Sequence, residues 1–442
     1  MSTNTAFSKV KMSNHNTQLY PICIVGFGLV GRALASLFIN NKNFNAEICV
    51  LEARKSLDHT PTYTSTGFIQ HKSLRLIKKF FATQPPILDT IDTFSFLFPD
   101  ITGKNKQLKH KTINFKQPIG YMLDLNSFLL KLKNNVLNYK KLQVYTQSYI
   151  QDILIGPEHF TLNTTIQDQS IQIKAKHLIV ADGAMSHTSK ILKNKGLKIN
   201  INNNFSQGAE AIVKIKPAVF QKIQNKVART VSFGISQQFL GYGMWIAPQK
   251  NNILKIGMAI DQKYLLKQKS NLAQLLNNTL SIAQKYLSIQ ESDMQILTKT
   301  FKLIPLVTAA QLYNVTPYKR IWQIGDAGGF VGPLLLDGIY PGLNSTIDTY
   351  KAIAQDLNLK TNIPEKQAKK SKLSWQPKES LPGNSIYTQK LLNYIKQSAM
   401  LKELYNLIFF NRFFYKLFNW LLYLFGGIGL KILFTLKREK PR

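Results

Sequence analysis

Cysteine and histidine are both scarce in this 442-residue sequence. The two cysteines, Cys23 and Cys49, lie in apolar segments that we expect to form strands. A disulfide framework is therefore excluded, and buried free thiols in a reducing compartment are expected. The seven histidines are far apart and show none of the spacings typical of metal ligands, so no metal site is expected.

Acidic residues are also few: 23 Asp and Glu stand against 57 Lys and Arg, a formal net charge of +34. Nucleic-acid-binding surfaces are typically built with arginines, whose guanidinium groups bind phosphates and base edges. Here most basic residues are lysines scattered among Asn and Ile, a pattern that coding bias produces by itself. No nucleic-acid partner is expected, and attraction to anionic lipid is the functional alternative.

The first 19 residues, MSTNTAFSKVKMSNHNTQL, lack both acidic residues and an apolar core. This composition excludes a secretory signal and predicts a disordered tail over residues 1–19. We expect a cytoplasmic protein, and a short organelle-targeting peptide is not excluded.

A glycine pattern stands between two apolar segments in YPICIVGFGLVGRALASLFINNKNFNAEICVLEAR. Gly26 allows a tight turn, Gly28 lets backbone N–H groups approach a pyrophosphate, and Gly31 lets the following helix pack closely on the strand. The N-terminus of that helix favours the phosphate charge. Glu52 ends the second apolar segment, where it can accept hydrogen bonds from a ribose diol, and Arg54 follows. This unit predicts nucleotide binding.

The middle of the chain contains further strand patterns. SIQIKAKHLIVADGAMSHTS combines an alternating strand with an apolar strand that stops at Asp182 and Gly183. Between residues 200 and 300, alternating segments such as EAIVKI and NNILKIGMAI predict a mainly antiparallel sheet, which the helical segment SNLAQLLNNTLSIAQKYL interrupts. We expect this sheet to form the substrate layer.

The C-terminal part begins with a third glycine-rich segment, IGDAGGFVGPLLLDGIYPGLNS, at residues 324–345. Residues 358–390 are rich in Lys and contain Pro, which indicates an exposed linker. The tail beyond them is dominated by apolar and aromatic residues, with Lys431 inside its most apolar stretch and basic residues on both sides. This stretch could barely span a bilayer, and the interior lysine favours a helix that lies in the membrane interface. Packing on the protein's own core is the alternative.

Three of these segments, in this order, resemble the cofactor motifs of FAD-dependent oxidoreductases with the para-hydroxybenzoate hydroxylase fold. They are CIVGFGLVG with Glu52, VADG with Ser186, and IGDAGGFVGPLLLDGIYPGL. The third segment, together with GYGMWIAPQKNNILKIGMAI and its Gly257, is most similar to the geranylgeranyl reductase branch. The resemblance covers about residues 21–357 and implies FAD as the cofactor.

The resemblance also implies roles for single residues. Asp326 would hold a ribityl hydroxyl of FAD, and the backbone N–H groups of Gly338 and Ile339 would point at the pyrimidine edge of the flavin. A helix N-terminus at that edge stabilises the reduced, anionic flavin. The implied cofactor-binding residues are Gly26, Gly28, Gly31, Glu52, Arg54, Asp182, Gly183, Asp326, Gly338 and Ile339, and no catalytic residue is identified.

The sequence departs from the family pattern at three places. Leu125 follows Asp124 where the family usually has an Arg that helps to clamp the cofactor. Leu335-Leu336 stand in place of a Thr-Gly pair, and Pro341-Gly342 replace a bulkier pair.

We therefore predict a mixed α/β fold, with a Rossmann-like FAD-binding domain, an interleaved antiparallel-sheet substrate domain and a C-terminal helical tail. The predicted segments are residues 20–75, 110–190 and 300–357 for the FAD-binding domain, 76–109 and 191–299 for the substrate domain, 358–390 for the linker, and 391–442 for the helical membrane-associating tail.

The preferred function is an FAD-dependent reductase of prenyl or other isoprenoid lipid chains at a membrane surface, with NAD(P)H or a redox protein as the external electron donor. A monooxygenase that hydroxylates an aromatic or quinone-precursor lipid shares the same motifs and stays open. A third alternative is a degenerate, non-catalytic FAD-fold protein. Flavin chemistry needs no catalytic triad or metal, since the protein supplies binding, orientation and electrostatics.

Overall fold

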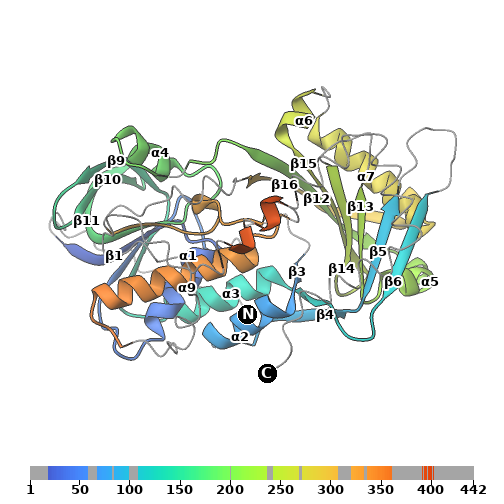
Figure 1. The fold of residues 1–442 in the computed structure, drawn as a ribbon, viewed down its shortest axis with the longest axis horizontal. Helices are drawn as coiled ribbons and strands as arrows, with labels where there is room; N and C mark the ends of the chain where they lie inside the picture. The colour runs from blue at the N-terminus through green and yellow to red at the C-terminus, as the bar shows by residue number, and fades with distance from the viewer. Residues whose placement is uncertain are drawn as a thin grey trace.

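The computed structural model of this chain has two halves that lie side by side, each built on a seven-stranded sheet (Figure 1). Its helices and its parallel and antiparallel strands confirm the predicted mixed α/β class. The structure describes residues 18–57, 67–81, 84–98, 108–199, 201–235, 242–267, 271–306, 320–332, 336–360, 391, 393–395, 397–400 and 402.

The first sheet has the strand order β8-β2-β1-β11-β10-β9, and β17 pairs with the end of β11. Strands β8, β2, β1, β11 and β17 are parallel, whereas β9, β10 and β11 form an antiparallel meander. All four residues of β2 are buried, as expected for a parallel strand covered on both faces. The strands are β1 (Leu19–Val25), β2 (Ile48–Leu51), β8 (Leu142–Tyr145), β9 (Ser148–Ile155), β10 (Phe160–Ile166), β11 (Gln169–Val180) and β17 (Ile321–Gln323).

Alternate residues of β1 enter two different cores. Ile22 and Ile24 pack with the helices on one face, whereas Cys23 and Val25 pack in the core that contains the meander. Cys23 and Cys49 are neighbours across β1 and β2, and both are buried free thiols, as predicted. The helices of this half are α1 (Leu29–Ile39), α2 (His71–Phe80), α3 (Leu125–Leu137), α4 (His187–Asn194) and α9 (Ile339–Asp356).

The second sheet has the order β16-β12-β15-β14-β13-β5-β6 and is antiparallel except between β13 and β5, which confirms the predicted, mainly antiparallel sheet. One face packs on α7, the helix expected in this region, and forms an apolar core. The strands are β5 (Thr93–Phe98), β6 (Lys109–Asn114), β12 (Phe205–Ile215), β13 (Thr230–Ile235), β14 (Tyr242–Pro248), β15 (Ile253–Asp261) and β16 (Met294–Pro305); the helices are α5 (Pro217–Val227), α6 (Gln262–Lys267) and α7 (Leu272–Leu287).

A small three-stranded sheet, β3-β7-β4, connects the two halves. Its Met122 packs against Val231 and Ala247 of the second sheet. These two residues alternate with the side chains that face α7, so the contact is made by the opposite face of that sheet. The remaining elements are β3 (Phe68–Ile69), β4 (Ile87–Ile91), β7 (Gly120–Leu123) and the 3₁₀ turns η1 (Glu291–Asp293) and η2 (Gly325–Gly328).

The second sheet extends past two boundaries that we expected from the sequence. β6 begins at Lys109 and lies mostly within the predicted segment 110–190, and β16 runs through residue 300, yet both belong to this sheet. Their places are set by pairing with β5 and β12, which local patterning does not reveal. We keep the division into two domains as a proposal, with β6 and all of β16 assigned to the substrate domain.

The first part of the tail is helical and lies between the two halves, as the red segment in Figure 1 shows. Leu391 and Ile395 pack against Phe330. Lys402 forms an ion pair of 2.9 Å with Asp261 at the end of β15. Within the described part of the chain, no helix is long and apolar enough to cross a membrane. Residues 403–442, most of the expected linker and the first 17 residues lie outside the described residues.

Candidate cofactor site

Glycines are required in the turn after β1 because side chains there would clash with the protein's own backbone. Gly26 has a φ of +95°, and a Cβ on it would lie 2.5 Å from the carbonyl oxygen of Ala181 at the end of β11. A Cβ on Gly31 would lie 2.2 Å from the carbonyl oxygen of Gly26. Gly28 is the N-cap residue of α1. The turn is thus pressed between α1 and the end of β11, as the glycine spacing predicts.

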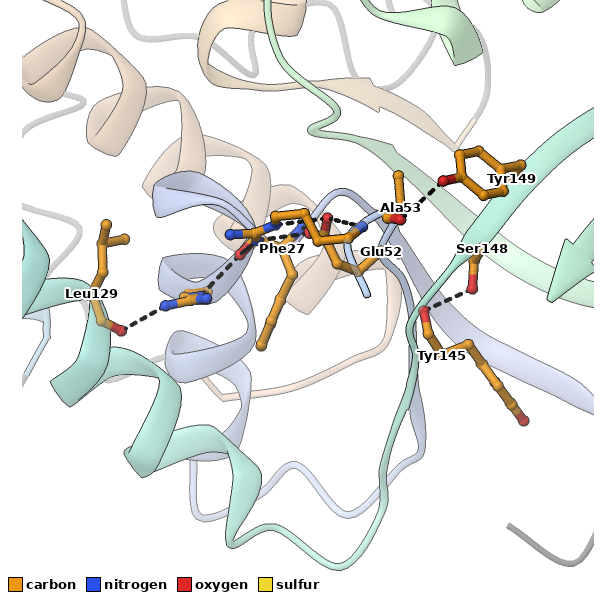
Figure 2. Close-up of polar contacts among 9 residues, drawn as sticks. Phe27, Glu52, Ala53, Leu129, Tyr145, Ser148 and Tyr149 are labelled. Atoms are coloured by element: carbon orange, nitrogen blue, oxygen red, sulfur yellow. Dashed lines mark hydrogen bonds and ion pairs between the residues drawn. The ribbon is translucent and has the colours of Figure 1, made fainter. Parts of the chain in front are cut away.

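Glu52 holds this turn in place from the end of β2, with only 6% of its surface exposed. Its Oε2 accepts the backbone N–H of Phe27 at 2.7 Å, and its two oxygens accept Nε and Nη2 of Arg54 at 2.9 and 2.8 Å (Figure 2). Burial by itself raises the pKa of Glu52, but Arg54 outweighs it and brings the pKa below its ordinary value. The carboxylate is therefore ionised at neutral pH, and a ribose diol would share it with Arg54.

Arg32 is a buried part of the site that sequence reasoning missed. Its side chain is fully buried, with Nε donating to the carbonyl of Phe27 at 2.9 Å and Nη1 donating to the carbonyl of Leu129 in α3 at 3.0 Å (Figure 2). α3 begins at Leu125, where the family has an Arg. The guanidinium that reaches α3 therefore comes from α1, and the charge within the otherwise apolar segment RALASLFI was its signal.

Asp182 and Gly183 lie in the turn that follows β11. Gly183 has a φ of +87° with open space around it, so backbone conformation explains this glycine. Oδ2 of Asp182 accepts the N–H of Thr188 at the start of α4 at 3.0 Å, while Oδ1 is buried and accepts no hydrogen bond from the described residues. Burial raises the pKa of Asp182. A buried oxygen without a partner is unfavourable, so a water molecule or a ligand is expected to donate a hydrogen bond there.

Asp326 lies in η2, directly after β17, and contacts the second sheet. Its Oδ2 is 3.0 Å from Nζ of Lys302 in β16. The Asn202 side chain donates to the backbone carbonyls of Asp326 and Ala184, at 2.9 and 3.1 Å, and so ties the loop after β11 to the loop after β17. A cavity of about 240 Å³ lies beside these loops, and Asn202, Phe205 and residues of α4 contribute to its lining.

Two glycines of the third motif make room for α1. Gly325 has a φ of +58°, and a Cβ on it would lie 2.8 Å from the side chain of Val30. A Cβ on Gly342 would lie 3.2 Å from the same valine. Some of the glycines in residues 324–345 are therefore explained by close packing between α1, η2 and α9.

The start of α9 differs from what the resemblance implies. Gly338 is the N-cap residue, but the N–H of Ile339 already donates to Oδ1 of Asp337 at 3.2 Å. Burial raises the pKa of Asp337, whereas the nearby Lys72 lowers it. Oδ2 of Asp337 accepts the hydroxyl of Tyr394 from the tail at 3.0 Å. A flavin at this helix end would therefore compete with Asp337 for the Ile339 N–H, because an Asp side chain caps a helix well.

The second sheet carries a buried polar cluster that sequence reasoning also missed. Glu210 in β12 is 1% exposed, and its Oε2 accepts the indole N–H of Trp245 in β14 at 3.0 Å. Its Oε1 lies 3.5 Å from Nζ of Lys255. Gly257 stands opposite both Glu210 and Trp245, and a Cβ on it would lie 2.4 Å from the indole ring. The glycine thus allows the indole to reach the carboxylate.

The predicted residues fall into two groups in space. Gly26, Glu52, Asp182 and Asp326 follow β1, β2, β11 and β17, which are parallel neighbours in the first sheet, so these residues meet at one edge. The second group, Gly338 and Ile339 at the start of α9, adjoins the first at Asp326: a Cβ on Gly338 would lie 3.4 Å from Oδ1 of Asp326. Among the described residues, no cluster of His, Cys, Asp or Glu could hold a metal ion.

Comparison with solved structures identifies proteins of similar fold. A geranylgeranyl bacteriochlorophyll reductase-like protein of Thermoplasma acidophilum matches with a TM-score of 0.60 and 12% identity, over 87% of this chain and 84% of that one. The p-nitrophenol 4-monooxygenase of Pseudomonas putida matches with a TM-score of 0.60 and 12% identity, over 87% and 88%. Aklavinone-11 hydroxylase, solved with FAD and aklavinone, matches with a TM-score of 0.54 and 12% identity, over 77% and 63%.

The scan of protein-family models and the search of curated proteins both found no match. The comparison therefore rests on the fold, to which the parallel sheet, its meander and the second sheet all contribute. The resemblance stated from the motifs is confirmed at this level: the chain has a fold that is shared by geranylgeranyl reductase-like proteins and flavin-dependent monooxygenases.

Proposed function

We propose that this protein is an FAD-dependent oxidoreductase that reduces prenyl or other isoprenoid lipid chains at a membrane surface. One observation carries the proposal. Glu52, Asp182 and Asp326 meet at the carboxyl edge of the parallel strands, and Asp326 is also paired with Lys302 of the second sheet. In open α/β sheets, this edge is where cofactors bind.

The residues present fit the adenosine half of FAD. Gly26 and Gly31 keep the turn compact, and the N-terminus of α1 opens beyond Gly28, where a pyrophosphate is favoured. Glu52 is an ionised acceptor for a ribose diol, and the unpaired Oδ1 of Asp182 can accept a further hydrogen bond from the ligand. Bound FAD would supply two-electron transfer, while the protein binds it, orients it and excludes water.

The flavin half fits with two adjustments. Asp326 would hold the ribityl chain and share its carboxylate with Lys302. The start of α9 would bind the ring only if the Asp337 side chain gave up the Ile339 N–H. Leu125 offers no guanidinium, and that of Arg32 is fully buried, with Nη1 bonded to the carbonyl of Leu129 in α3.

An apolar substrate is supported by the second sheet. Phe94 and Phe233 stack with their ring centroids 4.8 Å apart, and Phe96 lies 4.7 Å from Phe94. Phe233 stands next to Trp245 on the face that carries Glu210. Aromatic side chains bury large apolar areas, so the part of this face on β5, β13 and β14 suits a hydrocarbon chain better than a charged metabolite. The apolar, lysine-flanked sequence after residue 402 supports delivery of that chain from a membrane surface.

A monooxygenase is the second candidate. The p-nitrophenol 4-monooxygenase matches this chain with the same TM-score as the reductase-like protein and over a similar share of both chains. The stacked phenylalanines would suit an aromatic ring as well as a prenyl chain.

The test uses full-length protein in lipid nanodiscs, loaded with FAD and reduced without oxygen. Mixing with geranylgeraniol should reoxidise the flavin and add two hydrogen atoms to the lipid, as mass spectrometry would show. A flavin that reoxidises only with oxygen, and adds an oxygen atom to a quinone precursor, would establish the monooxygenase instead. A protein that stays colourless with excess FAD would favour the third alternative, a degenerate, non-catalytic FAD-fold protein.

A further inference from the structure

We propose that Glu210 transfers the proton in the double-bond reduction, with Lys255 as its proton source and Trp245 as its positioning residue. This inference rests on the proposed function and names the chain's own acid for it. The pair Glu210 and Lys255, with the indole of Trp245, is called the Glu210 cluster below.

The two faces of the second sheet differ sharply in chemistry. The face on α7 is lined by apolar residues, among them Val213, Ile256 and Met258. The alternate residues on the other face include Glu210, Lys255, Asp261 and Lys302. Strand pairing places Thr300, Glu210, Gly257 and Trp245 in one row across this face, so their side chains share a side. Lys302 stands one row on and reaches Asp326.

The face that carries Glu210 and Lys302, called the charged face below, is therefore turned toward the carboxyl edge of the parallel strands. This edge is called the candidate cofactor edge. Lys302 is the direct link, since it is 3.0 Å from Asp326, which follows β17. Contacts of Val231 and Ala247 with Met122 show that this same face adjoins the small sheet between the two halves. The row that contains Glu210 therefore lies on the side of the sheet that faces the first half of the molecule.

Structural stability alone does not account for the Glu210 cluster. Glu210 is 1% exposed and the Lys255 side chain is 14% exposed, so both charges are largely removed from water. Replacing such a pair by apolar residues is often neutral or stabilising, because desolvation offsets the attraction. Buried, interacting titratable groups are instead concentrated at functional sites.

The geometry also lets the pair exchange a proton. Oε1 of Glu210 lies 3.5 Å from Nζ of Lys255, whereas Oε2 is held by the indole N–H at 3.0 Å. Oε1 faces Nζ, so a proton passed from Lys255 to Glu210 would lie on Oε1. The indole keeps the carboxyl in one orientation in either state.

The chemistry of reduction requires such a group. When a carbon–carbon double bond is reduced, its π bond breaks and two new C–H bonds form. Bound FAD in its reduced form would supply one of these hydrogens together with both electrons. The second hydrogen comes as the proton on Oε1 of Glu210, which is left as a carboxylate, and Lys255 returns a proton to it and is recharged from water.

Two other charged groups on this face, among the described residues, form ion pairs away from Glu210. Lys302 pairs with Asp326 one row from Glu210, and Asp261, two rows away, pairs with Lys402 of the tail. Lys255 is therefore the charged group that faces Glu210 most directly among the described residues.

The experiment follows the indole N–H of Trp245 by NMR in full-length, FAD-loaded protein with ¹⁵N in its tryptophan rings. The chain has four tryptophans, and Trp245→Phe identifies the signal of interest. The signal should shift with one titration step between about pH 5 and pH 9, because a proton-transfer group must titrate near the working pH. It should stay flat in Glu210→Gln. The control Glu291→Gln, at an exposed glutamate of the same half, should titrate like the wild type.

Activity gives the second readout. Glu210→Gln should reduce geranylgeraniol reduction by about 100-fold or more, the usual range for loss of an acid, with FAD content unchanged. A wild-type indole signal that stays flat over this pH range would overturn the proposal without any variant, since Glu210 would then hold a fixed structural charge. If the signal titrates but no sample binds FAD, the proposed function fails while the proton-holding pair stands.

Discussion

Lys302 and Asp326 form an ion pair of 3.0 Å that joins the second sheet to the loop after β17. Both side chains are partly exposed, at 32% and 20%, so the pair itself contributes little to stability, about 0–1 kcal/mol. The pair instead positions the Asp326 carboxylate between the candidate cofactor edge and the charged face of the second sheet.

We expect Asp326→Ala to weaken FAD binding by about 1–3 kcal/mol, the range for losing a hydrogen bond to a charged group. Titration of the cofactor-free protein with FAD, followed by flavin fluorescence, measures this change. Lys302→Met is the matched control: it breaks the same ion pair but should alter FAD affinity much less. Equal losses in the two variants would show that the ion pair, and not a contact to FAD, is responsible.

Glu52→Ala should destabilise the protein by about 1–3 kcal/mol even without FAD, because it leaves the buried N–H of Phe27 without its acceptor. FAD affinity should fall as well. Urea unfolding of the cofactor-free protein separates the two effects. The exposed Glu158→Ala should change neither quantity, and a Glu52→Ala variant with full stability and full FAD affinity would remove Glu52 from the site.

Gly31→Ala should be strongly destabilising, because its Cβ would lie 2.2 Å from the backbone oxygen of Gly26 and neither helix nor turn can yield cheaply. Overpacking of this kind typically costs about 1–3 kcal/mol. Gly243→Ala serves as the control, since a Cβ there meets open space. In thermal unfolding, the Gly31→Ala variant should therefore melt at a clearly lower temperature than the Gly243→Ala variant. Similar melting temperatures would argue against the close packing of α1 on the turn.

Stability should fall as the pH drops because of His177. Burial is the main reason that its pKa decreases from 6.5 to about 4 in the folded protein, and its Nδ1 accepts the indole N–H of Trp322 at 3.2 Å. Between these two pH values the unfolded chain binds a proton that the folded chain does not. The free energy of unfolding should therefore decrease by up to about 1.4 kcal/mol per pH unit in this window.

Urea unfolding between the two pH values tests this linkage. His177→Gln should reduce the pH dependence, whereas the partly exposed His159→Gln should leave it as in the wild type. An unchanged slope in His177→Gln would assign the acid sensitivity to other groups.

Two truncations separate the parts of the tail. A chain that ends after Lys402 should fold, bind FAD and lose membrane association, which is proposed for residues 403–442. A chain that ends after residue 390 should also unfold at a lower temperature, because Leu391 and Ile395 are buried against Phe330, at about 1.5–3 kcal/mol for each apolar side chain. Flotation with anionic vesicles and thermal unfolding measure the two effects. A chain ending after Lys402 that still floats would remove the membrane role from residues 403–442.

Much of the local structure in both halves could be predicted from the sequence because its signals are local. The spacing of Gly26, Gly28 and Gly31 encodes a turn between strand and helix, and the structure shows that turn with Glu52 bonded to it. The helix predicted in SNLAQLLNNTLSIAQKYL forms as α7, because its apolar period matches a helix that covers a sheet. Burial of both cysteines follows in the same way from apolar strands.

The sequence by itself therefore determined the fold class, the glycine-rich turns and the order of the motifs. Only the tertiary structure decided which distant residues meet: Lys302 with Asp326, Trp245 with Glu210 across Gly257, and Asp337 with Tyr394 of the tail. Local conformation depends on neighbours in the chain, whereas these contacts depend on strand register and on the packing of two halves. A shift of one residue in the register of β12 would turn Glu210 to the apolar face, and no local pattern specifies that register.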